Sequence, residues 1–306
     1  MMRLGTRGSP LALAQAQGVA DRLRAAGTRV EIVPMRTEGD RLAEARLATV
    51  GGKGLFVREI EEALLAGALD LAVHSLKDLP AELPRGLVLG AFPEREDPRD
   101  VLVTPAGGAL EELRAGAVVG TSSPRRRALA LALRPDLVIE PIRGNVDTRL
   151  RKLAAGGWDG VILAAAGLQR LGLSPAHARP LPTDVFVPAV GQGILGVEVR
   201  GDDAETGRRV RALDHGPTRA SALAERACLE RLGASCTTPM AAHAWLEGRV
   251  LHMAAVVASE DGRQVLRERG TGSPEDAEAL GSRLAEVLLG RGAADVVPLM
   301  PGGRGR

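Results

Sequence analysis

The chain has 306 residues, enough for two or three domains, and 45% of them are apolar. A formal charge of +2 and an aromatic content of 2% disfavour a nucleic-acid binder, which needs a basic surface and stacking side chains. The sequence has no apolar run of membrane-spanning length, and its start lacks a signal-peptide core. We therefore expect a soluble, cytoplasmic, monomeric protein with no membrane or nucleic-acid partner.

The first third of the chain alternates short strands and helices. Strands are expected at 3–6, 29–35 and 69–75, and helices at 10–26 and 56–67. Ser9 should cap the first helix, with Pro10 at its first position. In the second helix, Ile60 and Leu64 should face inward and the acidic residues should face solvent. This alternation predicts a mainly parallel sheet with helices on both faces.

The middle of the chain repeats this order of elements, and the last part differs. The sequence LGTRGSPLALA near the N-terminus is matched by VGTSSPRRRALA further on, which predicts two related α/β lobes. Two segments apolar at both ends should cross between the lobes and form a hinge over a cleft. The last part reads as a small α+β domain. The predicted boundaries are 1–93 with 194–211 for the first lobe, 99–187 for the second and 216–306 for the third domain.

The segment LDLAVHSLKDLP ends a predicted buried strand with Lys77 and Asp78 side by side. A strand that ends this way places both charges at the carboxyl edge of a sheet, where open α/β folds bind ligands. Lysine is also scarce, since the only others are Lys53 and Lys152. The alternative interpretation is a solvated turn with a surface ion pair.

Arginines gather at predicted helix starts. Ser123 and Pro124 open a helix whose first turn holds Arg125, Arg126 and Arg127. Free N–H groups and the helix dipole favour an anion there, whereas three cations are unfavourable for the helix itself, so a negatively charged ligand would resolve the conflict. A solvated basic turn is the alternative. Related positions are Arg7, Arg143 and Arg149. The implied ligand carries several carboxylates or phosphates.

Three further motifs contain residue types that often form active or binding sites. The loop Gly51–Gly54 carries Lys53 and lacks the P-loop spacing, so it is either an active-site loop or a plain mobile loop. The glycines of 191–196 match a dinucleotide fingerprint, but strand-like residues follow them where a helix would be required. The cysteines and histidines near the C-terminus fit no compact zinc motif, so no metal is expected. Cys228 should be buried in a helix, and Cys236 should lie in an exposed loop.

Together these segments resemble the porphobilinogen deaminase family, also called hydroxymethylbilane synthases. The segments that carry the resemblance are TRGSPLALAQ, VGGKGLFVREIE, DLAVHSLKDLP, EREDPRD, VGTSSPRRR, IRGNVDTRL, AGLQRLGL, PAVGQG and ERACLERLGASCTTP. The resemblance implies a transferase that joins four porphobilinogen molecules head to tail with loss of ammonia and releases hydroxymethylbilane. It also implies a dipyrromethane cofactor on a cysteine thioether, and two periplasmic-binding-protein-like lobes plus a cofactor-bearing third domain.

The resemblance further implies roles for individual residues. Asp78 would be the catalytic acid, with Lys77 beside it, and Cys236 would carry the cofactor. Residues expected to contact the cofactor are Lys53, Ser9, Ser123, Arg125, Arg126 and Arg143. Residues expected to bind substrate are Arg7, Arg149, Arg170, Phe56 and Gln15. Members usually have two glycines before the cofactor cysteine, where this chain has Ala234-Ser235.

The same sequence features also fit a second function, that of a binding protein. A non-enzymatic binder of small polycarboxylates would use the same arginines in the same two-lobed cleft. Such a binder would need neither Asp78 nor Cys236.

Overall fold

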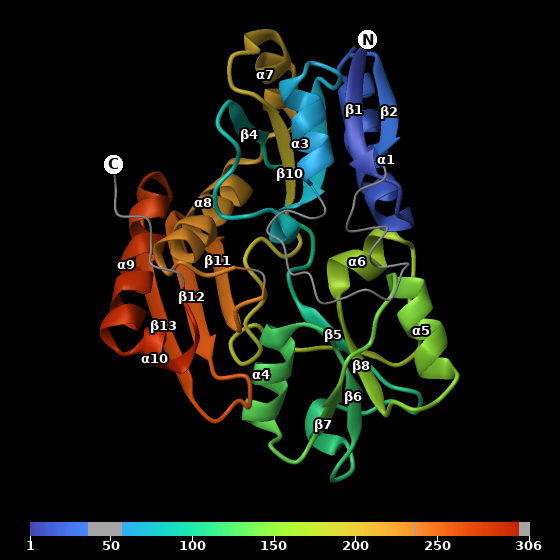
Figure 1. Cartoon of the computed structure of the whole chain (residues 1–306), viewed down its shortest axis with the longest axis vertical. Coiled ribbons are helices and arrows are strands. Elements are labelled where there is room, and N and C mark those ends of the chain that lie inside the picture. The colour runs from blue at the N-terminus through green and yellow to red at the C-terminus, as the bar shows by residue number, and fades with distance from the viewer. Residues whose placement is uncertain (36–56, 236, 300–306) are drawn as a thin grey trace. The chain divides into compact units, whose positions relative to one another are not determined.

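The computed structural model describes residues 1–35, 57–235 and 237–299. These residues form two compact units, and each is assembled from separate stretches of the chain (Figure 1). The first unit contains Met1–Arg95 and Ile194–Arg219, and the second contains Glu96–Gly193 and Ala220–Arg306. The chain thus passes between units within both predicted crossing segments. The finer three-domain boundaries stay a prediction.

The first unit is an α/β layer structure built on one five-stranded sheet. Its strands are β1 (Met2–Arg7), β2 (Val30–Met35), β3 (Leu71–Ser75), β4 (Leu87–Ala91) and β10 (Leu195–Arg200). Its helices are α1 (Pro10–Ala25), α3 (Arg58–Leu65) and α7 (Ala204–Val210). Ser9 caps α1 by accepting a hydrogen bond from the Ala12 N–H, as predicted.

The sheet has the order β2-β1-β3-β10-β4 and is mixed. Strands β1, β2 and β3 run parallel, whereas β10 runs antiparallel to both β3 and β4. The expectation of a mainly parallel sheet is therefore confirmed, since β1, β2, β3 and β4 run in one direction and β10 runs in the other. Because β10 returns from the crossing segment, it begins at the edge where β3 ends, with Leu195 opposite Ser75.

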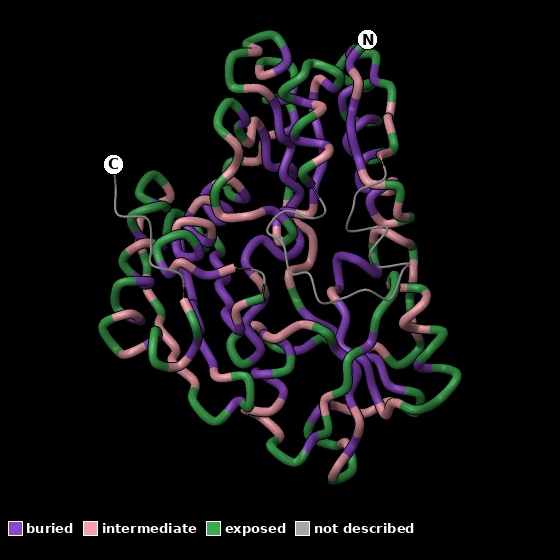
Figure 2. The backbone as a smooth tube through the Cα atoms, viewed as in Figure 1, coloured by how far each residue is buried: buried purple, intermediate pink, exposed green. Residues whose placement is uncertain are grey.

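The two faces of this sheet are covered by different helices. Leu71 and Val73 of β3 pack with α1 residues on one face, while Ala72 packs with Ile60 and Leu64 of α3 on the other. This alternation is the period-two pattern of a strand buried on both sides, and Figure 2 shows these strands as buried. His74, two residues after Ala72, and Glu198, directly opposite Ala72 on β10, accordingly lie on the α3 face.

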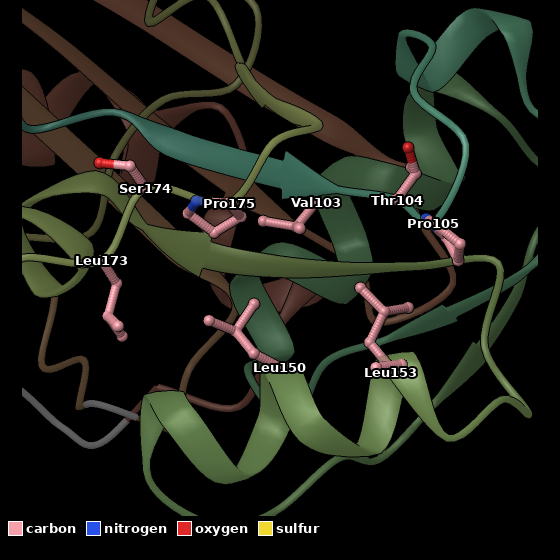
Figure 3. Close-up of a pocket in the computed structure, with 9 residues that line it drawn as sticks. Val103, Thr104, Pro105, Leu150, Leu153, Leu173, Ser174 and Pro175 are labelled. Carbon is pink, nitrogen blue, oxygen red and sulfur yellow. The ribbon is translucent and has the colours of Figure 1, made fainter.

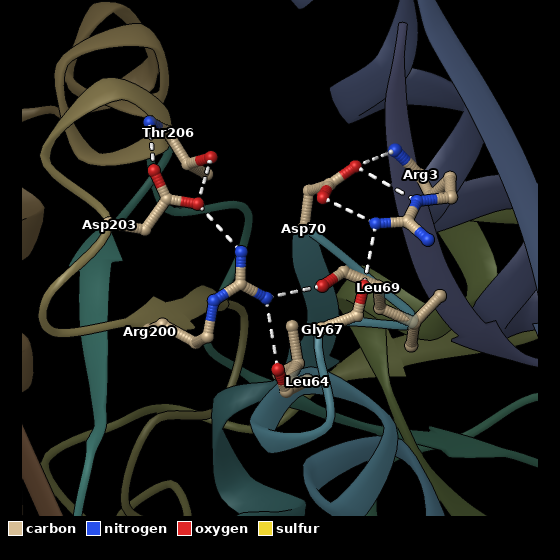
Figure 4. Close-up of polar contacts among 8 residues, drawn as sticks. All are labelled: Arg3, Leu64, Gly67, Leu69, Asp70, Arg200, Asp203 and Thr206. Atoms are coloured by element: carbon tan, nitrogen blue, oxygen red, sulfur yellow. Dashed lines mark hydrogen bonds and ion pairs between the residues drawn. The ribbon is translucent and has the colours of Figure 1, made fainter.

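Arg200 at the end of β10 fastens the connection between α3 and β3 (Figure 4). Its Nη1 donates to the carbonyl oxygens of Leu64, at 2.9 Å, and Leu69, at 2.6 Å, and its Nη2 pairs with Asp203. The Leu64 carbonyl also accepts from the Gly67 N–H in the turn that ends α3, and the guanidinium gives it a second donor. Helix α3 is thereby tied to both β3 and β10.

The second unit contains a five-stranded sheet and a three-stranded sheet. The first has the strands β5 (Asp100–Val103), β6 (Val118–Gly120), β7 (Val138–Glu140), β8 (Gly160–Ala164) and β9 (Ala178–Pro180). Its helices are α4 (Pro124–Leu133), α5 (Val146–Ala154) and α6 (Ala165–Arg170). The sheet order is β7-β6-β8-β5-β9, with β6, β7 and β8 parallel and β5 antiparallel to β8.

This sheet repeats the topology of the first unit. In both sheets one strand lies between two parallel neighbours, β1 between β2 and β3 and β6 between β7 and β8, and the strand from a crossing segment is inserted antiparallel in the fourth position. Strand β5 therefore begins where β8 ends, with Asp100 opposite Ala164. The two related lobes predicted from the sequence thus share one strand order.

The three-stranded sheet belongs to the α+β part of the second unit. Its strands are β11 (Met240–Glu247), β12 (Val250–Ala258) and β13 (Val265–Gly272), all antiparallel. Its helices are α8 (Gly216–Arg231), α9 (Ala277–Gly290) and α10 (Ala293–Val296), and α9 lies along β12 and β13 (Figure 1). Within the described ranges, no helix is long and apolar enough to cross a membrane.

Candidate functional site

In the first unit, the predicted site residues gather at the carboxyl edge of the parallel strands. Arg7 is the last residue of β1, and Ser9 caps α1 directly after it. Strand β3 ends at Ser75, and a single 3₁₀ turn then carries Lys77 and Asp78. The positive end of the α1 dipole lies at this edge and favours a negatively charged ligand there.

The Asp78 side chain is exposed, and its carboxylate has no hydrogen-bond or ion-pair partner among the described residues. The turn that carries it is fixed by its backbone, because the Leu79 N–H donates to the Leu76 carbonyl and the Leu76 N–H donates to Ile194. A carboxylate on a fixed turn can interact with a cationic ligand. Lys77 is half-buried beside it.

Gln15 also reaches this edge, from the buried face of α1. Its side chain is only 5% exposed, and its Nε2 donates to Ser75 Oγ at 2.9 Å. The amide therefore holds the last residue of β3 in place. A role in direct substrate contact, which the resemblance implies, stays a prediction.

In the second unit, the arginines at the start of α4 are held by a carboxylate of the protein. Arg125 Nη1 lies 2.7 Å from Asp100 Oδ2, and Arg126 Nη2 lies 2.8 Å from Asp100 Oδ1. All three side chains are buried. The expectation that a ligand alone would balance these cations is therefore wrong, because β5 begins at the edge where α4 starts and places Asp100 there.

The next helix start adds positive charge that Asp100 does not balance. Arg149 of α5 donates through Nε to the Gly144 carbonyl, and its terminal nitrogens have no acceptor in the described part of the chain. Burial, together with the nearby Arg126 guanidinium, lowers the pKa of Arg149. Arg143 is exposed beside it, and Gly144 has a φ of 112°, which favours glycine. An excess of guanidinium groups is suited to a ligand with several carboxylates.

Arg170, at the end of α6, is held by the crossing segments. Its Nη2 donates to the Gly193 carbonyl, and its Nε pairs with Glu96 at 2.8 Å. Nearby, Gln192 donates to Asp100, so the 191–193 turn supports the arginine cluster. This turn runs into strand β10 and not into a helix, which confirms that it is no dinucleotide fingerprint.

The structure confirms the predicted burial of Cys228. Cys228 is fully buried in α8, and burial together with Glu225 raises the pKa of its thiol to about 12. Next to Cys236, Ser235 Oγ lies 2.8 Å from Thr237 Oγ1, and the Ser235 N–H donates to Thr238. Cys236 itself, Lys53 and Phe56 lie outside the described residues.

A second charged cluster lies inside the first unit, beneath α3. His74 Nε2 lies 3.1 Å from Glu198 Oε2, and the two side chains are 3% and 0% exposed. Glu61 of α3 is 6% exposed, so the expectation that all acidic residues of this helix face solvent is wrong. Burial, with Glu198 nearby, raises the pKa of Glu61 to about 7, while His74 opposes the shift.

This raised pKa predicts a pH-dependent stability. The neutral carboxyl is favoured in the folded state, so its contribution is fully present below the ordinary pKa near 4.5 and is lost as the pH rises to about 7. In Glu61→Gln the side chain stays neutral, so Tm relative to the parent protein should rise by several degrees between pH 5 and pH 8. Thermal unfolding at both pH values measures this. A Tm difference that does not change with pH would contradict a buried, titrating Glu61.

The second unit also contains a cavity of about 370 Å³ between β5, α5 and the loop at 173–175 (Figure 3). Its lining residues are Val103, Thr104, Pro105, Leu150, Leu153, Ala154, Leu173, Ser174 and Pro175. None of them is charged and none is a predicted site residue. A polycarboxylate would find no cation there, so the arginine cluster remains the candidate site.

Two family models match almost the whole chain. The model "Porphobilinogen deaminase, dipyromethane cofactor binding domain" matches residues 2–208, and "Porphobilinogen deaminase, C-terminal domain" matches residues 220–290. The chain belongs to the porphobilinogen deaminase family. The family predicted from the sequence is therefore confirmed.

Curated relatives agree with this assignment over nearly full length. A porphobilinogen deaminase from Desulforudis audaxviator is 52% identical over 296 residues, which cover 96% of each chain. A porphobilinogen deaminase from Brevibacillus brevis is 48% identical, and the alignment covers 96% of each chain. One from Syntrophotalea carbinolica is 50% identical, and the alignment covers 95% of this chain and 93% of the relative. Among solved structures, a periplasmic substrate-binding protein from Coxiella burnetii has a TM-score of 0.44 at 21% identity, covering 74% of this chain and 97% of its own.

Membership of the porphobilinogen deaminase family confirms the enzyme class and the dipyrromethane cofactor expected from the sequence. The described residues fit such a cofactor, whose pyrrole rings carry acetate and propionate groups. Near the α4 and α5 starts, the Asp100 carboxylate pairs with Arg125 and Arg126, and Arg149 near Arg126 adds a further guanidinium. The buried Nε of Arg125 lacks an acceptor among the described residues. Anionic groups would complement this excess of positive charge.

Sequence reasoning missed Asp100, Glu198 and Glu61 as members of buried polar clusters. Asp100 leads into the apolar run DVLV, and Glu198 interrupts the apolar run ILGVEV. A carboxylate inside or beside a buried strand must be paired or neutral, which was an available signal. Glu61 gave less signal, since it lies among other acids on an amphipathic helix.

Proposed function

We propose that this chain polymerises four porphobilinogen molecules head to tail, with loss of ammonia, into hydroxymethylbilane, and that Asp78 is its catalytic carboxylate. The observation that supports this role is the exposed Asp78 side chain, which has no partner among the described residues and lies on a backbone-fixed turn at the carboxyl edge of the first sheet. Family membership favours this enzyme over the polycarboxylate-binding alternative. A cytoplasmic location and a monomeric state remain predictions.

Asp78 would act on the cation that forms when the aminomethyl group of porphobilinogen loses ammonia. The pyrrole nitrogen shares this positive charge, so a fixed carboxylate stabilises it and can move protons at the leaving amine and at the attacked ring carbon. Lys77, beside it in the same turn, would hold a substrate carboxylate.

The arginines would bind the acetate and propionate groups. Ser123, Arg125, Arg126 and Arg143 are proposed to hold the cofactor, and Arg149 and Arg170 the substrate. In the first unit, Ser9 is proposed for the cofactor and Arg7 and Gln15 for the substrate. Bidentate guanidinium contacts suit a product that gains two carboxylates with each added pyrrole.

The covalent cofactor would be carried by Cys236, with Lys53 and Phe56 contacting the bound pyrroles. The cofactor supplies the pyrrole carbon to which the first substrate is joined. Cys228 is unsuited to hold it, because a buried thiol with a pKa of about 12 is neither accessible nor ionised near neutral pH.

Alanine substitution should have different effects on stability and on KM for an arginine that is paired with Asp100 and for one that is not. Arg143→Ala should leave Tm within about 2 °C of the parent value but raise KM roughly tenfold or more, because an exposed guanidinium supports only the ligand. Arg126→Ala should lower both Tm and activity, since it also leaves part of the buried Asp100 charge unpaired, at a cost of about 3 kcal/mol.

Arg127→Ala is the matched control, because Arg127 shares the first turn of α4 but is exposed, and within the described ranges its side chain donates only to the Ile139 carbonyl. It should leave Tm and KM nearly unchanged. Normal kinetics in both Arg143→Ala and Arg126→Ala would overturn the proposed carboxylate-binding role.

The proposed activity is tested by incubating the purified protein with porphobilinogen and measuring ammonia and bilane. We expect four ammonia molecules for each hydroxymethylbilane. Binding of porphobilinogen without ammonia release would instead support the non-enzymatic alternative.

A further inference from the structure

The end of β3, immediately before the Asp78 turn, is fixed from both faces of the sheet. On the α1 face, Gln15 donates to Ser75. On the α3 face, His74 Nε2 lies 3.1 Å from Oε2 of Glu198 in β10, a diagonal contact across the two strands, since the register places His74 opposite Gly196 and Glu198 opposite Ala72. Beyond Ser75, the Leu76 N–H donates to the Ile194 carbonyl.

Burying the His74 and Glu198 side chains costs free energy of folding, because both polar groups lose their contact with water. Glu198 is fully buried in the middle of a sheet, and its Oε1 has no hydrogen-bond partner among the described residues. Apolar residues at these two positions would fill the space under α3 without burying charge, and replacing buried ion pairs in this way is often neutral or stabilising. Stability alone therefore does not account for the pair.

We propose that His74 and Glu198 are positioning residues that hold the end of β3, and with it the Asp78 carboxylate, in the geometry that the reaction requires. This inference rests on the proposed catalytic role of Asp78. The contact links β3, which leads into the turn that carries Asp78, with its antiparallel neighbour β10. The turn at 76–78 therefore begins from a fixed position. Displacement of a catalytic group by about 1 Å lowers rates by roughly 10²-fold.

Glu61 completes the cluster from α3. Its Oε1 is buried without a hydrogen-bond partner among the described residues, and the charged groups that act on it are Glu198 from β10, His74 from β3 and Glu62 from its own helix. Its raised pKa of about 7 favours the neutral carboxyl in this buried position. The helix end beside it is anchored to β10 by Arg200 (Figure 4).

Three variants of the cofactor-loaded enzyme test this inference: His74→Leu, His74→Gln and Glu198→Gln. We expect His74→Leu and Glu198→Gln to lower kcat roughly 10- to 100-fold with KM within about twofold, since the arginines are untouched. His74→Gln should recover most of kcat, because the glutamine amide can place a donor near the position of Nε2. Intact mass before each assay verifies that the cofactor is loaded.

Leu23→Ala is the matched control for lost stability. Leu23 is a fully buried core residue near the C-terminal end of α1, and its carbonyl accepts from the Thr28 N–H in the turn that leads into β2, away from the carboxyl edge. This variant should lower Tm with little change in kcat. A kcat loss in Leu23→Ala as large as in His74→Leu at equal Tm would show that the effect is only structural.

A second readout does not depend on activity. Because Glu198 raises the pKa of Glu61 and His74 lowers it, the pH range over which Tm falls should move down in Glu198→Gln and up in the His74 variants. Unshifted curves would contradict a shared buried cluster.

The outcomes separate this inference from the proposed function. A normal kcat in His74→Leu would overturn the positioning role, and if His74→Leu fails to fold, a normal kcat in Glu198→Gln would do so. In either case an inactive Asp78→Asn would still support the proposed mechanism. A fully active Asp78→Asn would instead overturn the mechanism itself.

Discussion

Asp78→Asn should retain the fold and the bound cofactor but lose turnover by roughly 10²–10⁴-fold. Asparagine matches the shape of aspartate, and the turn is held by backbone bonds of Leu76 and Leu79 that the substitution does not touch. The amide cannot stabilise a cation as a carboxylate does or accept a proton near neutral pH. Steady-state kinetics with porphobilinogen, combined with Tm, measure both parts of the expectation.

Asp97→Asn is a suitable comparison, because Asp97 is an aspartate that is paired with Arg99 and half-buried, whereas Asp78 is exposed. It should retain most of the turnover. If Asp78→Asn turned over at the normal rate, Asp78 would have no part in the chemistry and another group would have to stabilise the cation.

Cys236→Ser should abolish both the covalent cofactor and the activity. The wild-type protein should be heavier than its sequence by two porphobilinogen units less two ammonia molecules. The thiolate sulfur would form a bond to the methylene carbon from which ammonia has left, and its proton leaves with the amine. A serine hydroxyl is a far weaker nucleophile, so the added mass should be absent.

Cys228→Ala distinguishes the two sulfurs and should keep the added mass and the activity. Cys228 is buried in α8 with a raised thiol pKa, so its replacement by alanine removes one sulfur atom from the core. An adduct on the peptide containing Cys228 would show that the cofactor assignment chose the wrong cysteine. A wild-type protein that was active without any adduct would remove the cofactor from the account.

The sequence predicted best those features that depend on neighbouring residues. Ser9 with Pro10, and Ser123 with Pro124, identified two helix starts correctly because caps act over three or four residues. The alternation of strands and helices likewise predicted the α/β class and the related lobes. Nine ordered segments then identified the family more firmly than any single motif.

Pairings between distant residues could not be predicted in this way. Arg126 lies 26 positions from Asp100, and His74 lies 124 positions from Glu198. Both contacts exist because a crossing strand enters the sheet antiparallel, and the periodicity of a buried strand does not reveal its direction. The same strand direction explains why the sheet is mixed and why Asp100 and Glu198 have buried partners.

The most direct test of the central claim is the intact mass of the enzyme during its reaction with a few equivalents of porphobilinogen. The account predicts a series of masses above the cofactor-loaded protein, each one porphobilinogen less one ammonia heavier than the last, all mapping to the peptide that contains Cys236. With excess substrate the series should return to the cofactor-loaded mass as hydroxymethylbilane is released. A protein whose mass never changes while bilane accumulates would contradict chain growth on a cofactor carried by Cys236.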